Sequence, residues 1–234
     1  MNLIPHQYQE VEDIGNEIID NKARCVTFIS LAGNTGSSTV CASVAQRFKA
    51  HGHRVLIIDL NPISPLKLDE IDQSSGSPWC FSDISCQLNI IEHNQIDLLT
   101  MQNLSELESA KNKQIMKEAV ERLLQEYDYI LMDMSPAMKM NRGNVPLHAL
   151  SLCSDLTMVT VGLGVNDEES LCTSIKNIKQ GGHQNIRIIV TQHQFAPLGE
   201  RLLSSLERHR VHWPRLTQFL INKVNRQTWL FHPH

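Results

Sequence analysis

The chain has 234 residues, of which 41% are hydrophobic and 20% charged, and its formal net charge is −4. These values are typical of an ordinary globular protein with a sizeable core, and no run approaches the roughly 18 consecutive apolar residues of a membrane span. The negative charge argues against a dedicated nucleic-acid binder. The six cysteines form no CxxC pair, which favours reduced thiols in a cytoplasmic protein.

Strand-like and helix-like patterns alternate along the chain, which predicts an α/β fold with a mostly parallel sheet and helices on both faces. Apolar, β-branched runs predict strands at 25–31, 55–59, 96–100, 129–133, 156–161 and 186–191. Helical periodicity predicts helices at 10–21, 39–50, 104–126, 168–180, 198–210 and 215–226. The Pro-, Ser- and Gly-rich segment 61–94 is expected to be mostly loop.

No linker or internal repeat divides the chain, so we expect one domain over 1–234. Segment 1–22 contributes an N-terminal helix to it, and segment 214–234 forms a C-terminal amphipathic helix and tail.

A turn of small residues between the first strand and the second helix is typical of a phosphate-binding loop, because a helix N-terminus offers free N–H groups and partial positive charge. Aligned on Gly36 with the motif GxxxxGK[ST], the loop has Leu31 at the first glycine, Ser37 at the lysine and Ser38 at the Mg²⁺-binding hydroxyl. The phosphate-binding candidates are Gly33, Asn34, Thr35, Gly36, Ser37, Ser38 and Thr39.

Two carboxylates follow buried strands farther along the chain: Asp59 in VLIIDLNP and Asp133 in YDYILMDMSP. Ligands of open parallel sheets bind at the carboxyl ends of the strands. We therefore expect both side chains to lie near the loop, as vestigial catalytic candidates. The alternative, that they only cap their strands, is the weaker interpretation of this order and spacing.

These motifs, in this order, resemble the ParA/MinD superfamily of P-loop ATPases, and above all the cytoplasmic domains of bacterial tyrosine kinases of capsule and exopolysaccharide biosynthesis. The resemblance covers roughly residues 5–195, and it also includes the segment from Trp79 to Thr100. It implies a P-loop fold, and a nucleotide with Mg²⁺ held by Ser38 and Asp59.

The chain departs from this pattern where the chemistry is done. Ala32 stands at the position of the signature lysine that acts across a dimer, and Ser37 replaces the second lysine. Asn61 replaces the second aspartate of DxD, and Ser135 breaks the DxPP motif.

Features of the kinases are also missing. The three tyrosines form no terminal cluster, and Gln9 and Glu12 stand where the oligomerisation motif has arginines. We therefore expect no autokinase activity. The chain would require no cofactor, and would bind ATP or ADP with Mg²⁺ weakly at best.

Three functions stay open. The favoured one is a pseudo-ATPase that regulates or scaffolds an exopolysaccharide synthesis or export machine by binding its membrane-associated proteins. The second is a divergent ATPase that receives a lysine from another chain, as in a homodimer. The third is a MinD-like spatial regulator, in which segment 214–231 contacts the inner membrane. For that segment, packing on the protein is preferred over lipid binding.

Overall fold

The computed structural model describes residues 4–66, 78–83, 88, 90–93, 96–101, 104–163, 168–191, 202–203, 205–206, 214–225 and 227. By its internal contacts the chain divides into two compact units, Met1–Thr191 and Gln192–His234. The α/β fold lies within the first unit, and the single domain expected over 1–234 stays a prediction.

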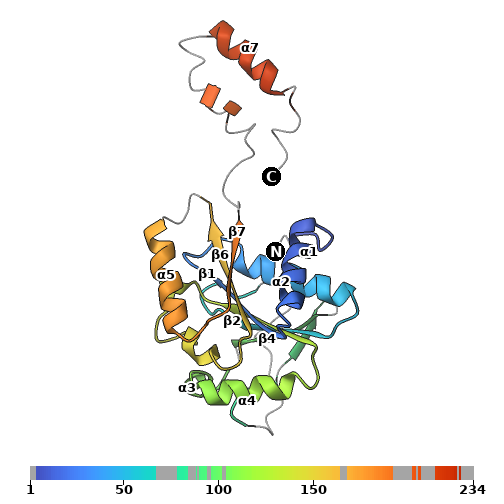
Figure 1. The fold of residues 1–234 in the computed structure, drawn as a ribbon, viewed down its shortest axis with the longest axis vertical. Helices are drawn as coiled ribbons and strands as arrows, with labels where there is room; N and C mark the ends of the chain where they lie inside the picture. Colours follow the sequence, from blue (N-terminus) through green and yellow to red (C-terminus); the bar gives the residue numbers. More distant parts are fainter. Residues whose placement is uncertain are drawn as a thin grey trace. The chain divides into compact units, whose positions relative to one another are not determined.

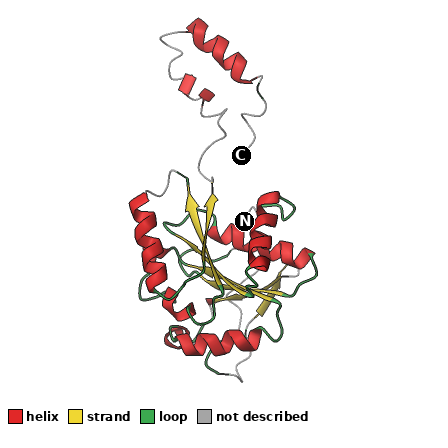
Figure 2. Cartoon of the chain, viewed as in Figure 1, coloured by secondary structure: helices red, strands yellow, loops and turns green. Residues whose placement is uncertain are grey.

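A seven-stranded sheet forms the centre of the first unit, in the order β3-β4-β2-β5-β1-β6-β7 (Figure 2). All neighbouring strands are parallel except β3, which pairs with β4 in the antiparallel sense. The strands are β1 (Cys25–Ser30), β2 (Val55–Leu60), β3 (Ile90–His93), β4 (Ile96–Thr100), β5 (Tyr129–Met134), β6 (Leu156–Gly162) and β7 (Ile186–Thr191). All six expected strands are therefore confirmed, and β3 was missed within the segment predicted to be loop.

Helices cover both faces of this sheet, with α1 and α2 on one side and α3, α4 and α5 on the other (Figure 1). In the first unit the α-helices are α1 (Gln9–Asp20), α2 (Ser37–Ala50), α3 (Leu107–Ala110), α4 (Lys113–Leu123) and α5 (Glu168–Gln180), with 3₁₀ helices η2 (Ala137–Lys139) and η3 (Leu147–Leu150). In the second unit, α7 spans Pro214–Asn225. The expected helix at 198–210 lies largely outside the described residues.

The helix predicted over 104–126 is interrupted at Asn112. Its side chain caps α4 by accepting hydrogen bonds from the backbone N–H groups of Gln114 and Ile115. An asparagine that satisfies two free N–H groups favours a new helix start over continuation.

Two hydrophobic cores lie on opposite faces of the sheet, because successive strand residues point to opposite sides. In β1, Ile29 packs into the core beneath α4 and α5, whereas Phe28 packs into the core beneath α1 and α2. Every residue of β1, β2 and β6 is buried. This burial on both faces explains why these strands are continuous apolar runs.

The first helix is tied to the second by the ion pair between Glu12 and Arg47, at 2.9 Å.

Among the described helices, none is both long and apolar enough to cross a bilayer.

Candidate functional site: a phosphate loop beside two paired aspartates

The turn between β1 and α2 has the backbone conformation of a loop that curls around an anion. Gly33, Asn34 and Gly36 have positive φ angles of 86°, 55° and 82°. Glycine adopts this conformation without strain, and asparagine tolerates it better than most residues. None of the backbone N–H groups from 33 to 38 donates a hydrogen bond to another described residue. These donors are therefore available to a ligand.

Thr35 anchors the loop to the neighbouring strands. Its hydroxyl lies 3.0 Å from that of Thr160 in β6, and its carbonyl accepts a 2.7 Å hydrogen bond from the hydroxyl of Thr191 in β7. Thr35 is buried, with 1% of its surface exposed. These bonds to β6 and β7 fix the backbone of the loop, so its free N–H groups keep their positions without a ligand.

The first residues of α2 present two hydroxyl groups. Ser37 is buried, and its Oγ has no hydrogen-bond partner among the described residues. Ser38 is half-buried. An unpartnered buried hydroxyl is costly, because it has given up its bonds to water. A ligand with acceptor oxygens would offset that cost.

Asp59 and Asp133 are directly paired across the neighbouring parallel strands β2 and β5. The structure thus brings together the two carboxylates that the sequence placed at strand ends. Both are almost fully buried, at 2% and 0% exposure.

The two carboxylates differ in their partners. Asp59 accepts hydrogen bonds from the backbone N–H groups of Asn61, at 2.9 Å, and Leu66, at 2.7 Å. Burial raises the pKa of Asp59 to about 6, and these two bonds oppose the shift. Asp59 therefore organises the segment after β2, which is the capping role we had considered the weaker alternative, while lone pairs of its oxygens remain for a cation.

Neither oxygen of Asp133 makes a hydrogen bond to a described residue. Burial, and then the nearby charge of Asp59, raise the pKa of Asp133 well above its ordinary value, while the Ser38 hydroxyl acts in the opposite direction. That hydroxyl is close enough to affect the pKa, although it does not meet hydrogen-bond geometry. A carboxylate in this state lacks a cation or a donor.

The two eroded acidic-motif positions form a buried polar network. The Ser135 hydroxyl donates to Asn61 Oδ1 at 3.1 Å and accepts from Asn144 Nδ2 at 2.8 Å. Asn144 Oδ1 in turn accepts from the backbone N–H of Asn141 at 2.8 Å. Neutral side chains therefore connect the ends of β2 and β5, and they fix both ends of the segment that contains η2.

This η2 segment returns to the phosphate loop. The Met138 N–H donates to the Leu31 carbonyl at 3.0 Å. A Cβ atom built on Gly33 would lie 3.2 Å from Pro136 Cγ and 3.3 Å from Lys139 Nζ. The ammonium group of Lys139 thus lies against the loop. Sequence reasoning missed Lys139, and its only signal was a lone cation soon after a strand-end aspartate.

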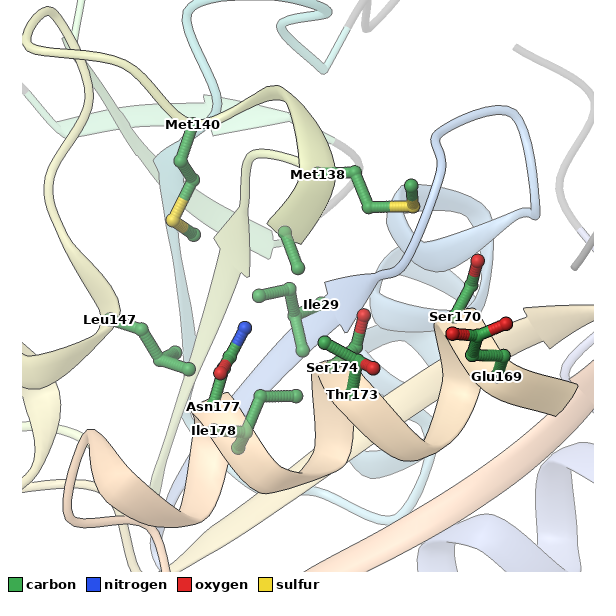
Figure 3. A pocket seen from close by; sticks show the side chains of 11 residues that line it. Ile29, Met138, Met140, Leu147, Glu169, Ser170, Thr173, Ser174, Asn177 and Ile178 are labelled. Atoms are coloured by element: carbon green, nitrogen blue, oxygen red, sulfur yellow. The ribbon is translucent and has the colours of Figure 1, made fainter. Parts of the chain in front are cut away.

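Residues of η2 and α5 line a cavity of 520 Å³ (Figure 3). In Figure 3, Met138 and Met140 lie opposite side chains of α5 that include Ser174 and Asn177. A second cavity, of 360 Å³, is bordered by Asp59, Asn61 and Thr100 at the carboxyl ends of β2 and β4. Open space therefore exists on two sides of the strand ends.

These residues fit a nucleotide phosphate with Mg²⁺. Oxygen ligands suit Mg²⁺, and Ser38, Asp59 and Asp133 would supply them at one edge of the sheet. The strongest sign of fit is that neither carboxylate oxygen of Asp133 has a hydrogen-bond partner among the described residues. A divalent cation would balance the negative charge of this buried carboxylate. The assignment of Mg²⁺ to Ser38 and Asp59, and of phosphate to residues 33–39, stays a prediction.

Solved structures with this fold include the kinase domain of the Escherichia coli tyrosine kinase ETK, at a TM-score of 0.63 and 14% identity over 79% of this chain and 73% of that one. The VpsO kinase domain matches with a TM-score of 0.62 and 15% identity, over 78% and 92% of the two chains. A ParA family ATPase from Chlorobium tepidum matches with a TM-score of 0.54 and 18% identity, over 75% and 77%. The expected P-loop α/β fold is thereby confirmed.

No curated protein sequence matches the chain significantly. The family model described as cellulose biosynthesis protein BcsQ matches residues 24–164, more than half of the chain. The chain therefore belongs to the cellulose biosynthesis protein BcsQ family, and its resemblance to ParA/MinD-like proteins and bacterial tyrosine kinase domains is confirmed.

Proposed function

We propose that this protein is a regulatory or scaffolding component of exopolysaccharide synthesis and export, with a P-loop domain that binds Mg²⁺-nucleotide weakly and hydrolyses it slowly or not at all. The observation that carries the proposal is the absence of any lysine from 31 to 39 in a chain of this family. At the lysine position stands Ser37, a buried residue whose hydroxyl has no partner among the described residues.

The size of the expected loss follows from the missing charge. A hydrogen bond between charged groups contributes about 1.5–3 kcal/mol, so one missing lysine weakens nucleotide binding by roughly 10- to 100-fold. Catalysis should suffer more, because phosphoryl transfer depends on positioned positive charge in the transition state. Binding without efficient turnover suits a regulatory component.

The role in exopolysaccharide synthesis is supported by the family, which is described as cellulose biosynthesis protein BcsQ, and by the fold shared with tyrosine kinase domains. In this proposal the partners are protein components of a membrane-associated polysaccharide machine. The protein would act in the cytoplasm and reach the inner membrane through these partners, as a monomer or a homodimer.

Direct lipid binding by α7 is the less favoured route to the membrane. Among its described side chains, Thr217 is buried, and Leu220, Ile221 and Val224 are half-buried. Apolar side chains already partly covered leave less surface for a bilayer. Flotation with anionic vesicles tests this: recovery of the protein with the vesicles would favour the spatial-regulator alternative.

Calorimetric titration with Mg·ATP and Mg·ADP, together with a phosphate-release assay, tests the nucleotide part of the proposal. We expect weak binding and little or no turnover. The Ser37→Lys variant restores the missing charge and should tighten Mg·ATP binding by about tenfold or more. Ser37→Ala is the control, since it changes the same buried position without adding charge.

A turnover rate like that of ordinary ATPases of this fold would contradict the proposal and favour a divergent ATPase. Light scattering with and without ATP would then show whether a second chain completes the site. The scaffolding role is tested separately, by co-purification of the tagged protein with the polysaccharide synthase from its native membranes.

A further inference from the structure

We propose that Lys139 is the phosphate-binding cation of this site and acts within the same chain in place of the lysines absent from the loop. This inference deepens the proposed function, because it rests on the same nucleotide site. The ligand is the phosphate chain of a Mg²⁺-bound nucleoside triphosphate. Lys139 is a binding residue in this scheme, and no bond-breaking step is assigned to it.

The first support is the position of its ammonium group. A Cβ atom on Gly33 would lie only 3.3 Å from Lys139 Nζ. Gly33 has a φ angle of +86° and lies among the N–H groups that have no acceptor in the described protein. The cation therefore lies beside the segment that carries the free donors, and both kinds of group attract a phosphate oxygen.

The second support is that this ammonium is not engaged elsewhere. Throughout the described part of the chain, Lys139 Nζ has neither an ion pair nor a hydrogen bond, although its neighbours in sequence are well anchored. Its side chain is exposed at the entrance of the loop. A cation in this position pays no desolvation cost until the ligand arrives.

The third support is that the backbone beneath Lys139 is constrained. The Met138 N–H bonds to the Leu31 carbonyl at 3.0 Å, and the Lys139 N–H bonds to the Pro136 carbonyl at 2.9 Å. The buried hydrogen bond from Asn144 to Ser135, at 2.8 Å, joins the two ends of the segment that contains Lys139. Such anchoring reduces the entropy lost when the lysine binds a ligand.

The fourth support is the charge balance of the site. Asp133 has two buried oxygens without partners, and Ser37 has a buried hydroxyl without one. A Mg²⁺-triphosphate would bring a cation to the carboxylate and acceptor oxygens to the hydroxyl. The phosphates would then need a protein cation, and Lys139 is a described cation that lies beside Gly33 of the loop.

The test compares the full-length protein with three variants by calorimetric titration with Mg·ATP. Lys139→Met keeps the length of the side chain and removes its charge, and Lys139→Arg keeps the charge. Lys176→Met is the matched control, because Lys176 is an exposed lysine on α5 that makes no ion pair with a described residue. We expect the Kd to rise by about 10- to 100-fold in Lys139→Met, to change less in Lys139→Arg, and to stay constant in Lys176→Met.

A second readout does not depend on the affinity of a variant. The wild-type protein is acetylated with a lysine-reactive ester, with and without saturating Mg·ATP, and each lysine is quantified by mass spectrometry. Mg·ATP and Mg·tripolyphosphate should both protect Lys139 and leave Lys176 unchanged, whereas adenosine should protect neither. Protection by tripolyphosphate shows that the phosphate chain, rather than the base, is recognised.

Equal Kd values for wild type and Lys139→Met, unchanged acetylation of Lys139, or no nucleotide binding at millimolar concentration would each overturn the role of Lys139. All three outcomes leave the scaffolding role in polysaccharide synthesis standing. Rapid ATP hydrolysis would overturn the proposed lack of efficient catalysis, but not the contact between Lys139 and phosphate. A complete lack of nucleotide binding would also remove the nucleotide part of the proposed function, whereas the other outcomes separate the two proposals.

Discussion

Asp59 and Asp133 lie opposite each other in register on the parallel strands β2 and β5. Burial raises the pKa of both carboxyl groups, and the charge of Asp59 raises that of Asp133 further. Two adjacent buried carboxyl groups resist simultaneous ionisation. A cation bound between these carboxyl groups would therefore stabilise their ionised forms.

The Asp133→Asn variant should be more stable than the wild type at neutral pH. Asparagine keeps the shape and cannot ionise, so it avoids the cost of a buried charge beside Asp59, and we expect a gain of about 1–3 kcal/mol in the free energy of unfolding. For a protein of this size, that corresponds to an increase in Tm of roughly 2–4 °C per kcal/mol. Thermal denaturation without Mg²⁺ or nucleotide measures the effect.

The same comparison has a predictable pH dependence. A carboxyl group whose pKa is raised in the folded state stabilises the fold below its unfolded value, and that stability is lost as pH rises through the folded pKa. The advantage of Asp133→Asn should therefore grow from pH 4 toward pH 8. An advantage that is largest at pH 4 would contradict the raised pKa of Asp133.

Mg·ATP binding should weaken on acidification. Asp59 has a pKa of about 6, and Mg²⁺ prefers the ionised carboxylate. Below pH 6, this group should reduce the apparent affinity by about tenfold per pH unit. The nucleotide titrates in the same range, so the profile is compared with that of Asp59→Asn. Identical profiles for both proteins would show that Asp59 holds no cation.

Gly33→Ala and Gly52→Ala form a matched pair. Both glycines have φ angles of +86°, so each substitution should cost about 1–2 kcal/mol of stability through backbone strain. Only the new Cβ of Gly33→Ala meets Pro136 and Lys139, because a Cβ on Gly52 would meet no atom within 4 Å. Nucleotide affinity should fall only in Gly33→Ala. An equal loss of affinity in both variants would show that strain, rather than the contact with Lys139, is responsible.

Asn144→Ala should destabilise the segment that carries Lys139. It removes the hydrogen bond that the Ser135 hydroxyl accepts and leaves the Asn141 N–H without its acceptor, which costs about 1–3 kcal/mol in the free energy of unfolding. Chemical denaturation measures this loss. Gln184→Ala, at an exposed side chain, is the control, with an expected change within about 0.5 kcal/mol. Nucleotide affinity that survives in Asn144→Ala would mean that this network does not position Lys139.

The sequence by itself determined the local elements of this protein. Buried parallel strands are continuous apolar runs, so β1, β2, β5 and β6 could be recognised without tertiary information. The strand–turn–helix order predicted a turn between β1 and α2, and the positive φ angles of Gly33 and Gly36 confirm a turn that favours glycine. The break at Asn112 and the short strand β3 were missed, because capping and edge pairing override local periodicity.

Only the tertiary structure decided which groups share the site. The pairing of Asp59 with Asp133 depends on the register of two strands that are far apart in sequence. The approach of Lys139 to the loop at Gly33 likewise brings together segments more than a hundred residues apart. Hydrophobic periodicity encodes which side chains are buried, but it carries no information on which distant segments meet. For that reason the loop appeared to lack a cation when the sequence was read alone, and the fold places one beside it.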